Sequence, residues 1–277
     1  MMLHLNKQRL VVLLAASLGS QVAMAAAPVG NASAWDMDVH INLIGVAQLD
    51  VGAQTSAALT NVVANASDLQ TLPSAAFASP LNLITLSTGV LASEAEYRGG
   101  GISAIAAHSS VDDLDLAAGT GVLSIAAGTV SSTTVLAGSC PNPVPGVNSL
   151  LGDFLFFSTF DAGNLGQGGD GGGDGGGDGG GIGGLPPGGS GLIDPVITIL
   201  STNVPGLPLN PPPNTTIDLP GLGIIGATLI LNEQTTSGDG VHSLSKGTNA
   251  IHLTLDVAAL VTADVIIAHS DVSLACP

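Results

Sequence analysis

The chain has 277 residues and a formal net charge of −17, with four Lys and Arg residues against 21 Asp and Glu residues. Nucleic-acid binding needs clustered Lys and Arg side chains that displace counterions, so this composition argues against a nucleic-acid partner. Aromatic residues make up only 3% of the chain. Apolar volume therefore comes from Val, Ile, Leu and Ala, which suits closely packed sheets.

Residues 1–25 have the pattern of a secretory signal peptide. Lys7 and Arg9 lie in a polar n-region, residues 10–18 form an apolar h-region, and residues 23–25 fit the small-residue cleavage rule. The apolar run is shorter than the roughly 20 residues that span a bilayer. We expect export to the periplasm, cell surface or extracellular space, with no transmembrane segment in the mature chain. That chain keeps two basic and 21 acidic residues, a charge of −19.

A first β-rich half is predicted at residues 26–162. Alternation of apolar and polar residues over 35–43, continued over 46–51, predicts a half-buried strand. Residues 54–80, rich in Ala, Ser and Asn, are interpreted as a short strand followed by a loop, and residues 57–69 are the only helix candidate of the mature chain. Further strands are expected at residues 81–86, 90–97, 102–116, 122–140 and 153–157.

Residues 163–191 form a Gly- and Asp-rich segment that we predict to be a flexible loop, because glycine loses much entropy on ordering and has no side chain to bury. A calcium-binding β-roll is the alternative, but the regularly placed apolar residue of such repeats is absent. Residues 192–277 form a second β-rich half, packed on the first. Its strands are expected at residues 196–200, 214–219, 224–231, 251–257 and 265–276, with a polar turn region at 235–249.

Short patterns recur in the two halves. Residues 39–43 (VHINL) have the pattern of residues 251–255 (IHLTL), and residues 107–111 (AHSSV) match residues 268–272 (AHSDV) at four of five positions. The strand runs are short and separated by Gly, Pro and Asn. We therefore predict an all-β fold of packed antiparallel sheets, a β-sandwich built from two related halves, with a β-solenoid-like stack as the alternative.

Cys140 and Cys276 are the only cysteines of the chain. Two cysteines in an exported protein are best interpreted as a disulfide pair. Each one ends a similar run of residues and is followed by proline. The predicted bond would join the end of one half to the end of the other.

His40, His108, His252 and His269 are the candidate metal ligands. The repeat gives His40 and His252 equivalent strand positions, and imidazole beside a carboxylate suits zinc or copper. However, no H-x-H or H-E-x-x-H spacing occurs. Polar strand faces with solvated or hydrogen-bonded imidazoles are the simpler interpretation, so we expect no metal and no other cofactor.

The chain shows no catalytic set. A G-x-S-x-G nucleophile elbow is absent. Glu94 with Glu96, or the acids within residues 112–115, could supply the paired carboxylates of a glycosidase. Sugar clefts usually need aromatic platforms, and Tyr97 is the only aromatic residue near these acids in the sequence. We therefore expect no enzyme and no catalytic residues.

Six short segments of the mature chain form a further pattern: GGGISA (99–104), PNTT (213–216), LPG (219–221), LNEQ (231–234, interpreted as a turn), NAIH (249–252) and ADVII (263–267). Together they resemble one protein family, the choice-of-anchor P family. The resemblance implies a secreted bacterial surface protein of a group whose C-terminal sorting signals vary, and it implies no catalytic residues. This chain ends at Cys276 and Pro277, and we expect no apolar sorting helix there.

These observations favour a non-catalytic secreted or cell-surface structural module of the adhesion type. Its partners would be further copies of itself or other cell-surface molecules. The alternative is an extracellular module that binds a metal or a small ligand at the histidine positions. A secreted hydrolase ranks third, because the residue roles of an active site are not filled.

Overall fold

The computed structural model describes the chain in ten ranges. The predicted signal peptide, the expected strand at residues 153–157 and residues 163–188 of the predicted loop lie outside them. The described ranges are 27–99, 103–119, 122–140, 189–193, 195–199, 202–204, 207–217, 228–240, 242–257 and 261–277.

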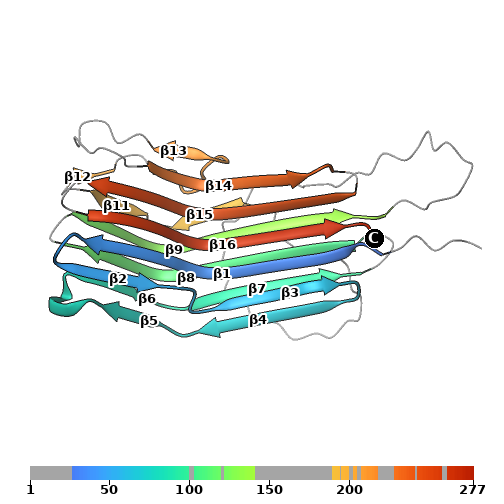
Figure 1. The fold of residues 1–277 in the computed structure, drawn as a ribbon, viewed down its shortest axis with the longest axis horizontal. Helices are drawn as coiled ribbons and strands as arrows, with labels where there is room; N and C mark the ends of the chain where they lie inside the picture. The colour runs from blue at the N-terminus through green and yellow to red at the C-terminus, as the bar shows by residue number, and fades with distance from the viewer. Residues whose placement is uncertain are drawn as a thin grey trace, which may run out of the picture.

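Two antiparallel β-sheets pack face to face in the described residues (Figure 1). The prediction of an all-β fold with packed antiparallel sheets is confirmed, and the alternative of a β-solenoid-like stack is not the architecture that these strands form. The helical structure of these ranges is one 3₁₀ turn, η1 (Pro80–Asn82). Within them, no helix is long and apolar enough to cross a membrane.

Sheet A has seven strands, and its central pair consists of the first and the last strand described, β1 and β16. β1 pairs with β16 along nearly its whole length, from Val29 opposite Ala275 to Leu43 opposite Val261. The strand order is β13 (Thr215–Ile217), β14 (Thr228–Gly238), β15 (Ser243–Val257), β16 (Val261–Ala275) and β1 (Val29–Leu43), with β2 (Ala47–Val51) and β3 (Ser56–Val62) both paired to β1.

Sheet B has nine strands around the long pair formed by β8 and β9. β6 and β7 share one edge of β8, while β10 and β11 share the far edge of β9. The strands are β4 (Ala66–Leu72), β5 (Ala75–Ala78), β6 (Ile84–Thr88), β7 (Leu91–Arg98), β8 (Ser103–Ala118), β9 (Leu123–Gly138), β10 (Gly189–Ile193), β11 (Val196–Ile199) and β12 (Thr202–Asn203).

Strands from both predicted halves take part in both sheets. β1 to β3 come from the range 26–162, yet they lie in sheet A beside β13 to β16. Conversely, β10 to β12 come from the range 189–203 and extend sheet B. The described residues therefore form one interleaved body. Residues 189–191, which the sequence assigns to the flexible loop, belong to β10 and pair with residues 131–133 of β9.

Two stretches contain more strand than the sequence predicts. Residues 54–80 form three strands, β3 to β5, so the helix candidate at 57–69 is wrong. There the alternately buried Ala57 and Leu59 follow a strand period that small and polar neighbours disguise. The turn predicted at 235–249 is also wrong, because β14 continues to Gly238 and β15 begins at Ser243. Most Ser and Thr residues of that stretch occupy the partly exposed ends of these strands, whereas Thr248 is buried.

The long strands change which side chains face the interior partway along. In β16, Val265 and Ile267 are buried, and the adjacent Ala268 and then Ser270 are buried as well. Ala268 has a left-handed φ of 55°, which shifts the alternation by one residue. Asn232 of β14 and Asp113 of β8, with φ of 51° and 46°, lie at the corresponding changes in their strands.

A polar belt divides the interior into two apolar clusters. The larger cluster contains Met37 and Val265, and the smaller one contains Ala34 and Leu136. Buried side chains that carry a hydroxyl or carboxyl group lie between them. The belt consists of Asp36, Thr55, Ser93, Ser109, Ser132, Thr134, Thr248 and Ser270.

Hydrogen bonds of the belt connect the two sheets directly. Ser109 of sheet B donates through Oγ to the Trp35 carbonyl of sheet A at 2.8 Å. Thr134 Oγ1, also of sheet B, lies 2.9 Å from the Thr248 hydroxyl and 2.8 Å from the Ser270 hydroxyl of sheet A. Such contacts need sheets that approach closely, which the small side chains of the belt allow. The belt therefore fixes the sheets' relative position by directional bonds rather than by apolar packing alone.

Asp36 holds the chain where it leaves β2 and enters β3. Its buried carboxylate accepts backbone N–H bonds from Met37, Gln54 and Thr55 at 2.8–3.0 Å. Burial raises the pKa of Asp36, and these backbone bonds oppose that shift. Because buried backbone donors are costly to leave unpaired, one side chain thus fixes the connection between the two edge strands of β1.

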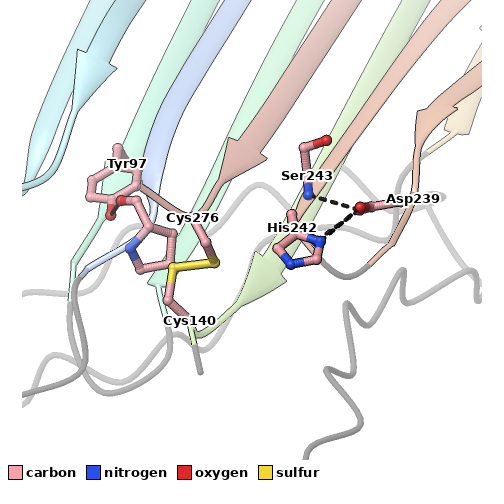
Figure 2. The surroundings of a disulfide bond; sticks show 7 residues. Tyr97, Cys140, Asp239, His242, Ser243 and Cys276 are labelled. Atoms are coloured by element: carbon pink, nitrogen blue, oxygen red, sulfur yellow. Dashed lines mark hydrogen bonds and ion pairs between the residues drawn. A yellow bond between two sulfur atoms is a disulfide. The ribbon is translucent and has the colours of Figure 1, made fainter. Parts of the chain in front are cut away.

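The predicted disulfide between Cys140 and Cys276 is present at one end of the sandwich, with a Cα–Cα distance of 5.4 Å (Figure 2). It joins the residues that follow β9 and β16, so it connects sheet B to sheet A. Nearby, the buried Tyr97 donates its hydroxyl to the Pro28 carbonyl at 2.7 Å. The Tyr97 ring lies so close to Gly30 that a Cβ there would approach it to 2.7 Å. The beginning of β1 and the end of β16 are therefore both held at this end of the sandwich.

Loss of this disulfide should destabilise the fold strongly. The bond closes a loop across 136 residues of sequence separation, for which the chain-entropy model gives about 5 kcal/mol. We expect urea unfolding of the double variant C140S/C276S to show a loss of most of this free energy of unfolding. The wild-type protein in reducing agent should show the same loss. An unchanged midpoint, or free thiols in the unreduced protein, would contradict the bond.

Glycine substitutions at two neighbouring alanines should differ in effect. Ala250 and Ala268 are both fully buried and lie between the same cross-strand pairs, but only Ala268 has a positive φ. Relief of left-handed strain is worth about 1–2 kcal/mol, whereas glycine in a regular strand costs about 0.5–1 kcal/mol. We expect A268G to be at least about 1 kcal/mol more stable than A250G in urea unfolding. Equal losses would contradict the change of face at Ala268.

Candidate functional site

The outer face of sheet A brings three of the four candidate histidines together. His252 lies on β15, His269 on β16 and His40 on β1, and all three point away from the interior because their strand neighbours are buried. We call this surface the histidine face. It consists of His40, His252 and His269 with their partners Asp38, Asp50, Glu233, Asn249, Asp264 and Asp271, and the adjoining Trp35.

His252 bridges the strands on either side of its own. Its Nδ1 lies 2.8 Å from Glu233 Oε2 on β14, and its Nε2 lies 3.3 Å from Asp264 Oδ1 on β16. Glu233 Oε2 also accepts a hydrogen bond from the Asn249 amide at 2.7 Å. The His252 ring and Glu233 are both half-buried, whereas Asp264 is exposed.

A row of side chains in direct register crosses the face from Glu233 to Trp35. Glu233 lies opposite Asn249, Asn249 opposite His269, and His269 opposite Trp35. His269 Nδ1 lies 2.5 Å from Asn249 Oδ1, and its ring stacks on the half-buried Trp35 at a centroid distance of 4.4 Å. On its other side, His269 Nε2 lies 3.6 Å from Asp271.

Asp271 connects this row to β1. Its carboxylate accepts a hydrogen bond from the Ser33 hydroxyl, on the strand opposite. Burial raises the pKa of Asp271, but the bonds from His269 and Ser33 outweigh burial and lower it overall. Asp271 is therefore held in its ionised form, as an acceptor for the imidazole beside it.

His40 lies between two carboxylates at the other end of the face. Its Nδ1 is 3.0 Å from Asp50 of β2, and its Nε2 is 3.1 Å from Asp38 of β1. The hydrogen bond to Asp50, with the charges of Asp38 and Asp264, raises the pKa of His40. In return, His40 lowers the pKa of Asp50. His40, Asp50 and Asp264 border a surface hollow of about 210 Å³, which is also lined by Ile41, Asn42, Gln48, Thr262 and Ala263.

His108 lies apart from the other three, on β8 of sheet B. Its Nδ1 is 2.9 Å from the Thr133 hydroxyl, and Glu94 lies opposite it in register. Burial lowers the pKa of His108 and so favours its neutral form. The sequence repeat that relates His108 to His269 therefore does not bring these two side chains together.

The face offers acceptors and titratable donors but no arranged metal site. Within the described ranges, no group of three His, Cys, Asp or Glu side chains is placed to hold a metal ion. The imidazoles lie between their carboxylates rather than converging with them on one point. Of the acids considered for a glycosidase, Glu96 accepts a hydrogen bond from Arg98 at 2.7 Å, and Glu94 faces His108.

Sequence reasoning did not identify five residues of the face, one of which is Asp50, opposite His40 on β2. Glu233 was assigned to a turn, but it lies within β14. Trp35, Asn249 and Asp264 join the face only through strand register, which alternation within one strand does not reveal. The available signal was the polar position next to each buried apolar residue on β14, β15 and β16.

No family model, no curated protein and no solved structure matches this chain.

The half-buried His108 imidazole of sheet B makes stability depend on pH. A folded-state pKa of His108 below the ordinary 6.5 means that the unfolded chain takes up the proton first. This contribution is complete above about pH 6.5 and is lost as the pH falls below it. We expect H108Q to lose less stability than the wild type between pH 7.5 and pH 5 in urea unfolding.

The matched control for this measurement is H242Q. His242 is exposed in the turn between β14 and β15, where its ring Nδ1 lies 2.9 Å from Asp239 Oδ2 (Figure 2) and its backbone N–H donates to Asp239 Oδ1. H242Q should follow the wild-type pH profile much more closely than H108Q does. If H108Q loses as much stability on acidification as the wild type, burial does not control the titration of His108.

Proposed function

We propose that this chain is a non-catalytic, exported structural module that acts at the cell surface or outside the cell. The observation that carries the proposal is the histidine face, where the polar side chains are engaged with one another across the strands. Glu233, for example, accepts bonds from both Asn249 and His252. Such a surface is a rigid, pre-formed platform, whereas an active site needs a nucleophile or a general base directed toward a substrate pocket.

Further support comes from how the body is held together. Two apolar clusters, the polar belt and the bond between Cys140 and Cys276 give a rigid scaffold whose disulfide needs an oxidising compartment. The signal-peptide pattern at residues 1–25 and the resemblance to the choice-of-anchor P family point the same way. A module of this kind works by presenting a stable surface to other molecules.

A second candidate function is the binding of a small ligand or a metal. The hollow beside His40 favours it, because an imidazole, carboxylates, amides and a hydroxyl border the same space. A ligand there would contact β1, β2 and β16 together. Binding would therefore raise the melting temperature of the body.

One experiment separates the two candidates. The natural producer would be fractionated, the mass of the processed protein measured, and the purified protein heated with zinc, copper or calcium. The structural module predicts removal of residues 1–25, a surface or extracellular location, loss of surface attachment on deletion and no metal-dependent shift. A periplasmic protein with a stoichiometric metal and a shift that H40Q abolishes would contradict it and support the second candidate.

A further inference from the structure

The histidine face has carboxylates but no permanent cations. Between residues 27 and 277 the basic residues are Arg98 and Lys246. Arg98 belongs to β7 of sheet B, where it bonds Glu96. Lys246 lies opposite the fully buried Val272, so it leaves β15 on the inner side of sheet A. The imidazoles are therefore the groups that can supply positive charge to the described outer face.

On each imidazole Nδ1 has a hydrogen-bond acceptor, and Nε2 has a carboxylate at ion-pair distance, 3.1 Å for His40, 3.3 Å for His252 and 3.6 Å for His269. A neutral imidazole has one N–H donor, so it can donate to only one of two such oxygens. A doubly protonated ring donates to both, and bonds between an imidazolium and a carboxylate are charge-assisted and stronger. His252 lies between Glu233 and Asp264, as described above, and an ionised carboxylate can accept hydrogen bonds but cannot donate one.

The other two rings repeat this arrangement. His40 lies between Asp38 and Asp50, and it faces Asp264 across the β1–β16 pair. His269 lies between Asn249 Oδ1 and Asp271. The stacked indole of Trp35 adds a further interaction that favours a cation over a neutral ring. The full bonding capacity of the face is thus reached only when all three rings carry two protons.

We propose that the histidine face is a proton-operated clasp, in which uptake of a second proton by His40, His252 and His269 binds neighbouring strands of sheet A to one another. His252 connects β14, β15 and β16. His269 connects β15 and β16 and stacks on β1, and His40 connects β1 with β2. The clasp thus runs across sheet A and becomes stronger as the surroundings become acidic.

The clasp also changes the surface that the face presents. Five carboxylates, at Asp38, Asp50, Glu233, Asp264 and Asp271, face three imidazoles, so the formal charge of these eight groups goes from −5 with neutral rings to −2 with protonated rings. Less repulsion within the face is a second source of acid stabilisation. This inference goes beyond the structural role proposed above and does not depend on where the protein resides.

The groups around each ring set the direction of the effect. The titratable side chains beside His252 are Glu233 of β14 and Asp264 of β16, and those beside His269 include Asp271. His40 faces Asp38, Asp50 and Asp264, and its raised pKa agrees with a contribution that is complete below about pH 6.5 and lost as the pH rises. His108 of sheet B has the opposite sign, so it provides an internal contrast.

The first test compares melting temperatures of the full chain and H252Q at pH 6.0 and pH 8.5. Glutamine keeps one donor for Glu233 or Asp264 but cannot gain a charge. We call the amount by which the melting temperature of a variant lies below that of the wild type its deficit. We expect the deficit of H252Q to be larger at pH 6.0 than at pH 8.5 by about 2–4 °C. Taking the difference at each pH cancels every other titrating group, including His108.

H108Q is the matched variant, because its deficit should change with pH in the opposite direction. A deficit of H252Q that is equal at the two pH values, or larger at pH 8.5, overturns the clasp. If H252Q does not fold, E233Q replaces it. That variant keeps the imidazole and removes one carboxylate, and its deficit should likewise grow on acidification.

The second test uses the single tryptophan of the chain. Trp35 stacks on His269, so the charge of that ring changes the indole fluorescence directly. We expect the emission of the folded wild type to be lower at pH 5 than at pH 8.5, and H269Q to abolish this difference. A fluorescence that does not change between pH 8.5 and pH 5, or a transition that persists in H269Q, overturns the assignment for His269.

Discussion

The left-handed backbone at Ala268 is the constraint on which the arrangement of sheet A depends. Ile267 and Ala268 both face the interior, so every side chain beyond this point changes side. Without the change, His269 would point inward with Ile267, and the apolar cluster would continue into a charged ring. β1, β14 and β15 change face at corresponding positions, so paired residues on neighbouring strands point to the same side of the sheet. Trp35 and His269 therefore meet on the outer surface.

The same change places the polar belt beneath the histidine face. Small hydroxyl side chains let the sheets approach closely enough for Ser109 to bond a backbone carbonyl of the opposite sheet. The interior is therefore fixed by directional bonds at its middle, by apolar packing on both sides and by a disulfide at one end. A platform fixed in this way can hold imidazoles and carboxylates in register over five strands, which a flexible surface would not do.

The sequence was sufficient for features that depend on alternation or composition, and insufficient for those that depend on register. The all-β class, the disulfide and the outward position of His252 follow from patterns within one strand or from cysteine count. The change of face at Ala268 has no such signal, because alanine is not a typical left-handed residue. Residues 54–80 were misjudged since small side chains weaken the period of β3 to β5. The partnership of Trp35 with His269 needs the pairing of the first strand with the last.

The most direct measurement of the central claim is the protonation state of His252 in the folded protein. Nitrogen-15 NMR of histidine-labelled protein over a pH series distinguishes a ring with two N–H groups from one with a single N–H. The account predicts that the His252 ring keeps both N–H groups to a higher pH in the wild type than in E233Q or D264N, because each variant removes one of the carboxylates beside the ring. Loss of the second N–H at the same pH in all three proteins would contradict the account.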